Sequence, residues 1–599
     1  MIEQIKEISE NLYRIEDSCN VYLIRREDKC ICVDFGTGVV LKYLKELNIQ
    51  TVEAILLTHH HRDQAEGLEK AQNLGIPILV PETEQELLCD VEEMWQRREI
   101  YNSYNNRQDR FSILTSVYAD RLQDYKKYLY LGMEFQILPT PGHTIGSISI
   151  VCEVERKKIA FTGDLIYDRG KLWSLAATQW SYNGGEGLPY TILSLLQIQD
   201  EGIDWMLPSH GNLMRTHDAV PLTVEKITRL QNLREQNPRL FLLRETPYEK
   251  ITEHVLFNRT SMANSYVLLS KSGKALIIDF GYDFMAGTAS GTDRSARRPW
   301  LYTIPILEKQ FGVRKIDACI PTHYHDDHVA GMNLLKTRYG TKIFCPETYA
   351  DILENPHAYD LPCLWYEPIS VDKQISYSTP FQWEEYQIQL YPLSGHTRFS
   401  CAVFFEADNK RILCTGDQYA GEEGTLPNYV YKNLFSYNDF QKSAALYRKL
   451  KPDWILSGHW TKKAPDLEFY NKLEQIGKEV CELHRELLPM EGTMNPENDF
   501  YAVCYPYQKT VEAGEQFTVK VQRNQLGHKG KVRAELILPE GFQCCGESDY
   551  VFEDMEEIAE FTVKAPKWEV RRARIGCRIW CDNLCRGTQA EMLVTSKRR

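Results

Sequence analysis

The chain has 599 residues, and at roughly 150 residues per domain this length predicts about four domains, or fewer if some are large layered folds. Its 70 Lys and Arg residues against 83 Asp and Glu residues give a net charge of -13, which repels phosphate backbones and anionic lipids and disfavours nucleic-acid and membrane partners. No apolar run approaches the roughly 18 residues of a membrane span, and the start lacks a secretory signal. The 17 cysteines are too dilute for a disulfide scaffold. We therefore expect a cytoplasmic protein with reduced thiols.

The first predicted elements are two apolar strands that form a hairpin between Asn20 and Gly36. A short buried strand, Ala54-Ile-Leu-Leu, then ends in the polar cluster Thr58-His-His-His-Arg-Asp-Gln64, and a helical pattern follows. Residues 92–130 are charged and aromatic and are expected to form a helical insertion. Three short motifs come next, and a helical pattern near residues 222–236 closes the region. The motifs are Gly142-His-Thr, Phe161-Thr-Gly-Asp164 and Ser209-His210.

The same pattern returns, in the same order, in the second half of the chain. The hairpin lies between Asn264 and Gly281, and the strand with its polar cluster is Ala318-Cys-Ile-Pro-Thr-His-Tyr-His-Asp-Asp-His328. The three motifs return as Gly395-His-Thr, Cys414-Thr-Gly-Asp417 and Gly458-His459. The spacing is kept, since 21 residues separate His143 from Asp164 and also His396 from Asp417. Each copy alternates strands with helical stretches over about 240 residues, which predicts one layered α/β domain per copy.

The pattern changes after the second copy. Apolar residues from Phe469 to Leu487 recur four and three apart, which predicts a helix packed on its own domain. From about residue 494 apolar and polar residues alternate, as in Phe517-Thr-Val-Lys-Val, and this predicts an antiparallel β-sandwich of about 100 residues. The sandwich sequence resembles the immunoglobulin-like accessory modules of bacterial multidomain proteins. We therefore expect domains at residues 1–245, 246–492 and 493–599.

The polar cluster of the second copy carries candidate metal ligands. His323, His325, Asp327 and His328 follow one buried strand closely enough to be aimed into one cleft. Imidazole and carboxylate together suit a divalent ion such as zinc, and iron or manganese with little change. Three more candidates, His396, Asp417 and His459, each end a strand, which is where layered α/β folds place functional groups. Seven ligands exceed one tetrahedral site and suit two metals that share a bridging oxygen.

This ordered set of motifs resembles the metallo-β-lactamase-fold hydrolase superfamily, and Gly-His-Thr followed by Thr-Gly-Asp is most similar to its glyoxalase II (hydroxyacylglutathione hydrolase) branch. The resemblance implies an αββα four-layer fold in each copy. It also implies a first metal held by His323, His325 and His396, a second held by Asp327, His328 and His459, and Asp417 as the bridge between them.

In the first copy the same resemblance implies His59, His61 and His143 as ligands of the first metal, and Asp63, Asp164 and His210 toward the second. This copy departs from the pattern at Gln64, where the family has His. An amide oxygen is a poor zinc donor compared with imidazole, so we expect the second site of this copy to be weakened or empty. The expected occupancy is thus two metals in the second copy and one or two in the first.

The expected function is a metal-dependent hydrolase that cleaves an ester or thioester of a small molecule by a metal-bound hydroxide, with its principal site in the second copy. Asp327 is the expected catalytic residue, because it can hold the nucleophile in orientation through the metal and accept its proton. Amide, lactone and phosphodiester substrates stay open, as does homo-oligomer formation. An alternative is a mononuclear-iron persulfide dioxygenase that uses His323, His396 and Asp417, and another makes the first copy and the sandwich non-catalytic scaffolds.

Substrate specificity is expected to lie in insertions. A Gly/Ser/Thr-rich loop at residues 286–298, which the first copy lacks, carries Arg294, Arg297 and Arg298. These guanidinium groups are candidates to hold an anionic substrate under a lid, and the alternative is a solvated loop. Tyr167 follows Asp164 by three residues, a placement similar to the oxyanion-binding tyrosine of lactonases in the superfamily, and its alternative is a packing role.

Overall fold

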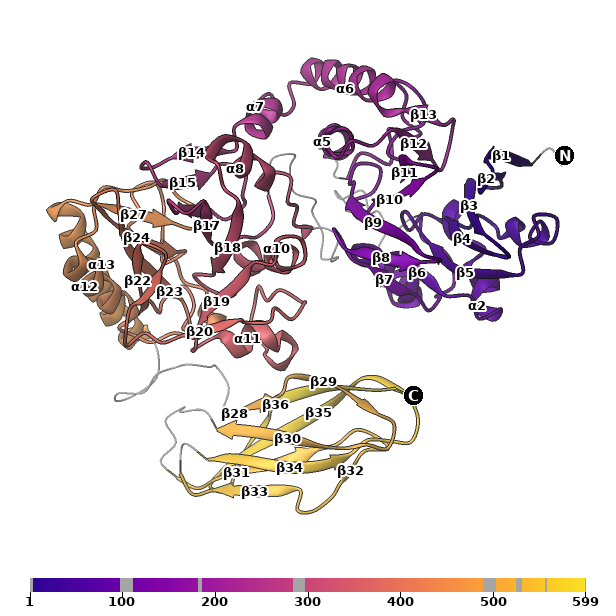
Figure 1. Ribbon diagram of the computed structural model, residues 1–599. Coiled ribbons are helices and arrows are strands. Elements are labelled where there is room, and N and C mark those ends of the chain that lie inside the picture. The colour runs from indigo at the N-terminus through magenta and orange to yellow at the C-terminus, as the bar shows by residue number, and fades with distance from the viewer. Residues whose placement is uncertain are drawn as a thin grey trace. The chain divides into compact units, whose positions relative to one another are not determined.

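The computed structural model describes residues 4–96, 111–180, 186–283, 297–487, 502–523, 530–554 and 557–597 (Figure 1). The chain divides into two compact units. The first contains Met1–Pro247, Tyr282–Gly312 and Leu334–Gly340, and the second contains Tyr248–Gly281, Val313–Asn333 and Thr341–Arg599. The predicted domain boundary at residues 492 and 493 lies outside the described residues.

The first copy is built from two β-sheets and the helices that cover them. The larger sheet has the order β1-β2-β3-β4-β5-β6-β7 and the smaller one β13-β12-β11-β10-β9-β8. An apolar core between the sheets includes Tyr22, Phe135 and Phe161. A second core on the other face of the larger sheet joins Leu23 to Leu68 of α2. Helices α5 and α6 pack together and complete the four-layer arrangement that the sequence predicts.

The elements of this copy alternate along the chain as expected. The strands are β1 (Ile5–Ser9), β2 (Leu12–Glu16), β3 (Asn20–Arg26), β4 (Lys29–Val33), β5 (Thr51–Leu56), β6 (Ile78–Pro81), β7 (Asp120–Leu122), β8 (Lys127–Tyr130), β9 (Met133–Pro139), β10 (Ile148–Val154), β11 (Lys157–Gly163), β12 (Trp205–Pro208) and β13 (Met214–Arg215). The helices are η1 (Val39–Lys42), α1 (Arg62–Ala65), α2 (Leu68–Asn73), η2 (Glu82–Glu84), α3 (Glu86–Cys89), α4 (Val91–Gln96), α5 (Gly187–Asp200), α6 (Thr216–Leu233) and α7 (Leu240–Glu245). Helix α8 (Ile304–Phe311) and most of α10 (Met332–Tyr339) belong to the same unit.

The second copy repeats the two sheets. The larger has the order β14-β15-β16-β17-β18-β19-β20 and the smaller β21-β22-β23-β24-β27. The strands are β14 (Tyr248–Lys250), β15 (Val255–Asn258), β16 (Ser265–Leu269), β17 (Lys274–Ile278), β18 (Lys315–Ile320), β19 (Lys342–Pro346), β20 (Lys373–Ile375), β21 (Phe381–Trp383), β22 (Tyr386–Pro392), β23 (Cys401–Ala407), β24 (Lys410–Gly416), β25 (Tyr419–Ala420), β26 (Leu426–Pro427) and β27 (Trp454–Ser457). The helices are α9 (Asp326–Val329), α11 (Ala350–Glu354), η5 (Pro356–Ala358), η6 (Tyr431–Asn433), α12 (Asp439–Leu450) and α13 (Leu467–Leu487).

The predicted helix after the second copy is α13, and it packs on its own domain as expected. Phe469 and Leu473 on one of its faces share an apolar core with Phe440 and Tyr447 of α12. Burying such an amphipathic face, rather than helix propensity alone, stabilises a helix of this length.

The C-terminal region is all-β, as predicted. Two sheets, β28-β30-β34-β32 and β29-β36-β35-β31-β33, enclose a core to which Val519, Ala534 and Ile575 contribute alternate residues of their strands. The strands are β28 (Ala502–Tyr505), β29 (Gln508–Glu512), β30 (Gln516–Arg523), β31 (Val532–Ile537), β32 (Gln543–Cys544), β33 (Asp549–Phe552), β34 (Ile558–Lys564), β35 (Val570–Cys581) and β36 (Leu584–Lys597). All 17 cysteines of the chain are free thiols. No helix in the described part of the chain combines the length and hydropathy that crossing a bilayer requires.

Candidate metal centres

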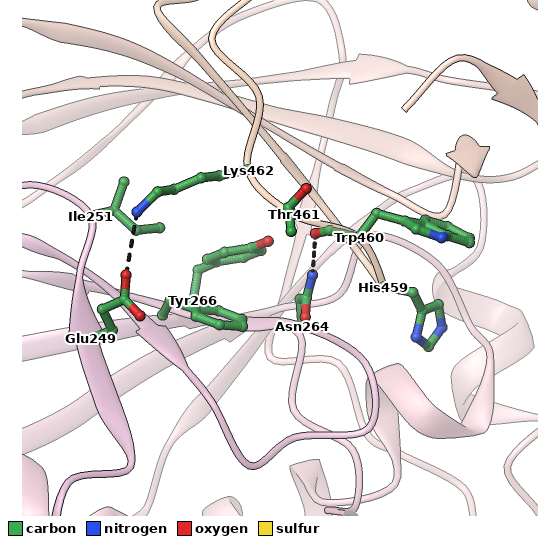
Figure 2. Close-up of a pocket in the computed structure, with 9 residues that line it drawn as sticks. Glu249, Ile251, Asn264, Tyr266, His459, Trp460, Thr461 and Lys462 are labelled. Carbon is green, nitrogen blue, oxygen red and sulfur yellow. Dashed lines mark hydrogen bonds and ion pairs between the residues drawn. The ribbon is translucent and has the colours of Figure 1, made fainter. Parts of the chain in front are cut away.

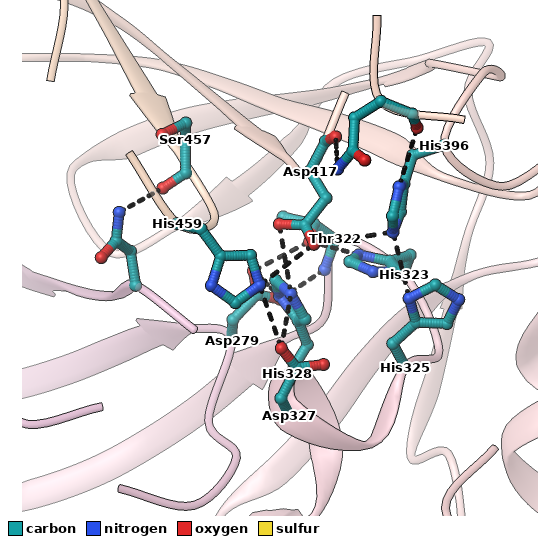
Figure 3. Close-up of polar contacts among 12 residues, drawn as sticks. Asp279, Thr322, His323, His325, Asp327, His328, His396, Asp417, Ser457 and His459 are labelled. Carbon is teal, nitrogen blue, oxygen red and sulfur yellow. Dashed lines mark hydrogen bonds and ion pairs between the residues drawn. The ribbon is translucent and has the colours of Figure 1, made fainter. Parts of the chain in front are cut away.

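Seven side chains from the ends of four strands come together in the second copy, and we call this group the second centre (Figure 3). The turn after β18 carries His323 and His325, and α9 then begins with Asp326. Asp327 and His328 lie in the first turn of that helix. The remaining three follow strands of the smaller sheet: His396 after β22, Asp417 after β24 and His459 after β27.

The inner atoms of the second centre are close enough to share cations. His396 Nε2 lies 3.1 Å from His325 Nδ1 and 3.5 Å from Asp417 Oδ2. His459 Nε2 lies 3.0 Å from Asp327 Oδ2 and 3.1 Å from Asp417 Oδ2. Within three overlapping groups, all ligand atoms lie within 4.8 Å of one another. The groups are His323, His325 and His396; His323, His328 and Asp417; and Asp327, His328 and His459.

Each imidazole of the second centre is also held from outside through its other ring nitrogen. His323 Nδ1 lies 3.1 Å from Thr322 Oγ1, His325 Nε2 lies 2.7 Å from Asn433 Nδ2, His328 Nδ1 lies 2.9 Å from Asp279 Oδ2, His396 Nδ1 lies 3.0 Å from Asn428 O, and His459 Nδ1 lies 3.2 Å from Met262 O. A half-turn of the Asn433 amide would present its oxygen to the imidazole, so this residue can accept the Nε2 proton. Outer partners of this kind fix the tautomer and orientation of metal-binding histidines.

Asp279 is a functional residue that the sequence analysis missed. It follows β17 with φ +59°, is 2% exposed, and accepts hydrogen bonds from the backbone and side chain of Thr322 as well as facing His328. The signal was present, because Asp34 takes the matching position and a φ of +56° in the first copy. Asn428 and Asn433 were missed too, and they have no motif that could have identified them.

Burial and charge set the protonation of the five imidazoles. Burial, with neighbouring imidazoles as the next cause, lowers the pKa of His323 well below its usual value and that of His325 to about 3, and burial also lowers the pKa of His396. Burial would lower the pKa of His459 as well, but hydrogen bonds to Asp327 and Asp417 raise it to about 10. Burial would also lower the pKa of His328, but Asp417, Asp327 and Asp279 raise it well above its usual value. Three neutral imidazoles thus have lone pairs to offer, and two cationic imidazoles, those of His328 and His459, lie beside the carboxylates.

The donor set fits a pair of divalent cations. Among the residues that the structure describes, none hydrogen-bonds to His323 Nε2, His328 Nε2 or Asp417 Oδ1, although all three atoms are buried. His328 Nε2 and Asp417 Oδ1 face each other at 3.4 Å. Leaving buried polar atoms without hydrogen bonds is costly, and a pair of bound cations would satisfy these three atoms. Nitrogen and carboxylate donors suit zinc, and also iron or manganese. The seven residues would therefore hold the ions that the sequence predicts, without fixing which metal is native.

The second centre has an open side next to His459. The His459 and Asp327 side chains are 28% and 16% exposed. A cavity of about 410 Å³ borders His459 and is lined by Phe257, Tyr266 and Trp460, with the ion pair Lys462–Glu249 among its walls (Figure 2). A small molecule that reached the second centre would have an apolar, aromatic wall beside it.

The first centre consists of His59, His61, Asp63, His143, Asp164 and His210, which the structure also brings together. His143 Nε2 lies 3.0 Å from His61 Nδ1 and 3.5 Å from Asp164 Oδ2. In place of an imidazole, the Gln64 amide donates to Asp63 Oδ2 at 3.2 Å and to Asp164 Oδ2 at 3.3 Å. Within the described ranges of the chain, no residue hydrogen-bonds to His61 Nε2 or His143 Nδ1, unlike the matching histidines of the second copy.

The arginines expected to bind substrate have other surroundings. Arg294 lies outside the described residues, and Arg297 Nη1 donates to the hydroxyl of Tyr282 at 3.2 Å. Arg298 differs most from the expectation. Its side chain is 5% exposed and forms two hydrogen bonds to the Asp124 carboxylate, at 2.6 and 2.8 Å, and it also donates to the carbonyls of Ile145 and Ser147. A guanidinium committed to these partners inside the first unit is a structural group rather than a substrate contact.

Tyr167 is also placed by packing. Its ring stacks on Trp173 with centroids 5.5 Å apart, and Trp173 stacks in turn on the His210 ring at 4.0 Å. Tyr167 and Trp173 both line a cavity of about 490 Å³ in the first copy. The described contacts of Tyr167 thus favour the packing role over the oxyanion role.

Comparison with known proteins identifies the family. The family model described as Metallo-beta-lactamase superfamily matches residues 14–232 of the chain and again residues 259–459. Hydroxyacylglutathione hydrolase of Pseudomonas entomophila (strain L48) is 25% identical over 172 residues, which is 28% of this chain and 52% of that protein. Hydroxyacylglutathione hydrolase of Citrobacter koseri is 32% identical over 149 residues, which is 25% of this chain and 47% of that protein. The chain thus spans about half the length of the curated relatives it matches.

A solved metallo-beta-lactamase from Elizabethkingia meningoseptica is 16% identical and covers 40% of this chain and 93% of its own, with a TM-score of 0.30. A TM-score this low adds nothing to the family match. The two matched stretches cover more than half of the chain, and they contain the ligand residues of both centres. The chain therefore belongs to the metallo-β-lactamase superfamily, as a tandem pair of its domains.

Proposed function

We propose that the chain is a two-metal hydrolase of a small-molecule ester or thioester, with its principal active site at the second centre. The proposal rests on the complete set of inner and outer contacts of the histidines there. Every imidazole has one nitrogen held by an outer partner and the other turned toward Asp327 or Asp417 or toward a neighbouring imidazole. Such preorganisation is what metal-assisted hydrolysis requires of a protein.

A bound pair of divalent cations supplies an activated water and a Lewis acid for the scissile carbonyl. The protein's own groups do the rest. Asp327 is the proposed catalytic residue, because its carboxylate is partly exposed and lies at the open side of the centre, 3.0 Å from His459 Nε2. From there it can orient the attacking water and accept its proton. The imidazole of His459 is the neighbour of the Asp327 carboxylate and limits the direction in which that carboxylate can turn.

Ester or thioester cleavage is favoured over the other hydrolytic reactions by the relatives named hydroxyacylglutathione hydrolase. We infer that the cavity beside His459 accepts an apolar part of the substrate, since Phe257, Tyr266 and Trp460 form its walls. The first copy has Arg14 at the register position of Phe257, opposite the matching tyrosine, so this apolar wall is a feature of the second copy. We also propose a cytoplasmic location, which suits 17 free thiols.

The persulfide dioxygenase alternative uses only His323, His396 and Asp417. It leaves the imidazoles of His325, His328 and His459 and the Asp327 carboxylate without a role, although they complete the same cluster. The hydrolase accounts for all seven side chains, so we favour it.

The test is a screen of the purified, metal-analysed chain against thioester, lactone and phosphodiester panels, with His325→Ala as the inactive control. We expect turnover of thioesters or esters that the control lacks. Oxygen consumption with a persulfide and one iron per chain would instead support the dioxygenase, and equal turnover by the control would place the activity elsewhere.

A further inference from the structure

The two centres differ in how their bridging carboxylate is used. In the first copy the ligand atoms of His59, His61, His143 and Asp164 all lie within 4.8 Å of one another as one group of four. In the second copy the matching three histidines form a group without Asp417, which is grouped with His323 and His328 instead. Asp164 thus lies within 4.8 Å of all three histidines of the first copy, and it is also grouped with Asp63 and His210. In the second copy His396 Nε2 likewise lies 3.5 Å from Asp417 Oδ2, but His325 and Asp417 do not fall in one group.

Three distances within this group of four are compatible with a single bound ion. His59 Nε2 and His143 Nε2 lie 3.6 and 3.5 Å from Asp164 Oδ2, and His143 Nε2 lies 3.0 Å from His61 Nδ1. Bonds of about 2.0–2.1 Å around tetrahedral zinc place neighbouring ligand atoms about 3.3 Å apart. All four residues are buried, at 6% exposure or less. Structural zinc sites have four protein ligands, whereas catalytic sites keep a position open for water.

A second difference concerns the other half of the centre, where Asp63, Asp164 and His210 are grouped without the imidazole that His328 supplies in the second copy. Gln64 replaces the imidazole of His328, and Ser209 replaces Gly458 at the matching position. In the second copy a Cβ on residue 458 would lie 1.9 Å from Asp417 Oδ1 and 2.9 Å from His328 Cε1, so a side chain there would displace both groups. In the first copy the Ser209 hydroxyl donates to Asp34, the carboxylate whose counterpart Asp279 holds His328.

The last ligand of the first copy is occupied as well. His210 Nδ1 lies 2.7 Å from Asp164 Oδ1, and its Nε2 lies 3.1 Å from the carbonyl of Ser18. In the second copy it is Nδ1 of His459 that contacts the matching carbonyl, that of Met262. The Nε2 atom of His459 therefore faces the carboxylates. The His210 ring is in addition covered by the parallel ring of Trp173. His210 thus faces Asp164 through Nδ1, and through Nε2 it faces the Ser18 carbonyl and Asp63 Oδ2, which lies 3.2 Å away.

We propose that the first copy binds one divalent cation in a closed site of His59, His61, His143 and Asp164, and that this ion stabilises the first unit rather than performing hydrolysis. The first copy has Gln64 where the second has His328, and Ser209 where the second has Gly458. Together these two differences remove the site of the second ion and give Asp34 a serine partner in place of a histidine. The proposal concerns the first copy alone and holds whatever substrate the second centre takes.

The test uses the full chain with the second centre disabled by His396→Ala and Asp417→Asn, so that bound metal reports on the first copy. We expect one zinc ion per chain by elemental analysis, and a lower midpoint of thermal unfolding after the ion is removed with a chelator. Two ions, or none, would overturn the proposal, as would a midpoint that chelation leaves unchanged. Asp164→Asn is a mild ligand variant, expected to lose the ion and lower the midpoint while thioester turnover by an intact second centre persists.

A restoration experiment tests the role of the exchange itself. In the disabled background, Gln64→His alone and Ser209→Gly alone are each expected to leave one ion per chain. The double variant Gln64→His with Ser209→Gly is expected to bind two, because it supplies the imidazole and the space that surrounds it in the second copy. A second ion in the Gln64→His single variant, or a count of one in the double variant, would show that Ser209 is not part of the block.

Discussion

Replacing Arg298 with methionine tests whether this residue, expected from the sequence to hold substrate, is a structural group of the first unit. The substitution keeps much of the side-chain volume and removes the guanidinium. Asp124, which is 8% exposed, then loses two hydrogen bonds of 2.6 and 2.8 Å, and the carbonyls of Ile145 and Ser147 lose their donor. Breaking a buried ion pair by removing one partner costs about 3–5 kcal/mol.

This loss of stability is large enough to be measured by thermal unfolding. For a folding unit of about 150–250 residues, each kcal/mol lowers the midpoint of thermal unfolding by about 2–4 °C, so the Arg298→Met variant should unfold about 6–20 °C earlier in the transition that includes the first unit. Scanning calorimetry measures this directly. The matched control is Arg298→Met combined with Asp124→Leu, which removes the stranded carboxylate and should recover part of the loss. A shift below about 2 °C, or a loss of turnover without a loss of stability, would refute the structural role.

Further outcomes concern the second centre. Asp279→Asn keeps the shape of an outer partner and removes its charge, and it should lower metal affinity or turnover by about 10–100-fold; unchanged values would contradict the role of Asp279. Asp327 and Asp417 raise the pKa of His459 to about 10 and also raise the pKa of His328, so both imidazoles carry protons at pH 7 when no metal is bound. Metal binding should therefore release about two protons, and the metal affinity should increase as the pH rises. Calorimetry in buffers of different ionisation enthalpy measures this, and buffer-independent heats would be the contrary result. Phe257→Arg should raise KM for substrates with apolar acyl groups by about ten-fold with kcat retained, and an equal effect on small polar substrates would count against the cavity.

The fold and the grouping of the candidate ligands were predictable for a physical reason. The candidate ligands follow strand ends in a fixed order, and the duplication repeats that order, so His323, His396 and Asp417 could be paired with His59, His143 and Asp164 from the sequence alone. The period of the hydrophobic pattern likewise identified α13 and the all-β C-terminal region.

Contacts between residues far apart in the sequence could not be predicted in the same way. Arg298 and Asp124 are 174 residues apart, and nothing in a Gly/Ser/Thr-rich loop indicates that its last arginine is buried. Residues 92–130 were expected to be helical. They are helical in α4 up to Gln96, residues 97–110 lie outside the described ranges, and the later part contains the short strands β7 and β8, because pairing at a sheet edge overrode local propensity. Asn433 acts on His325 through a side-chain contact across 108 residues, which no local pattern encodes.

Seven side chains of the second copy are proposed to hold the ions that drive hydrolysis. The most direct measurement is elemental analysis of the full chain with the first centre removed by His61→Ala, taken together with thioester turnover of the same sample. We predict two divalent ions per chain and sustained turnover, with both lost on adding Asp417→Asn. A chain that retains no ion under generous metal supply, or that turns over equally well with Asp417→Asn, would contradict the claim.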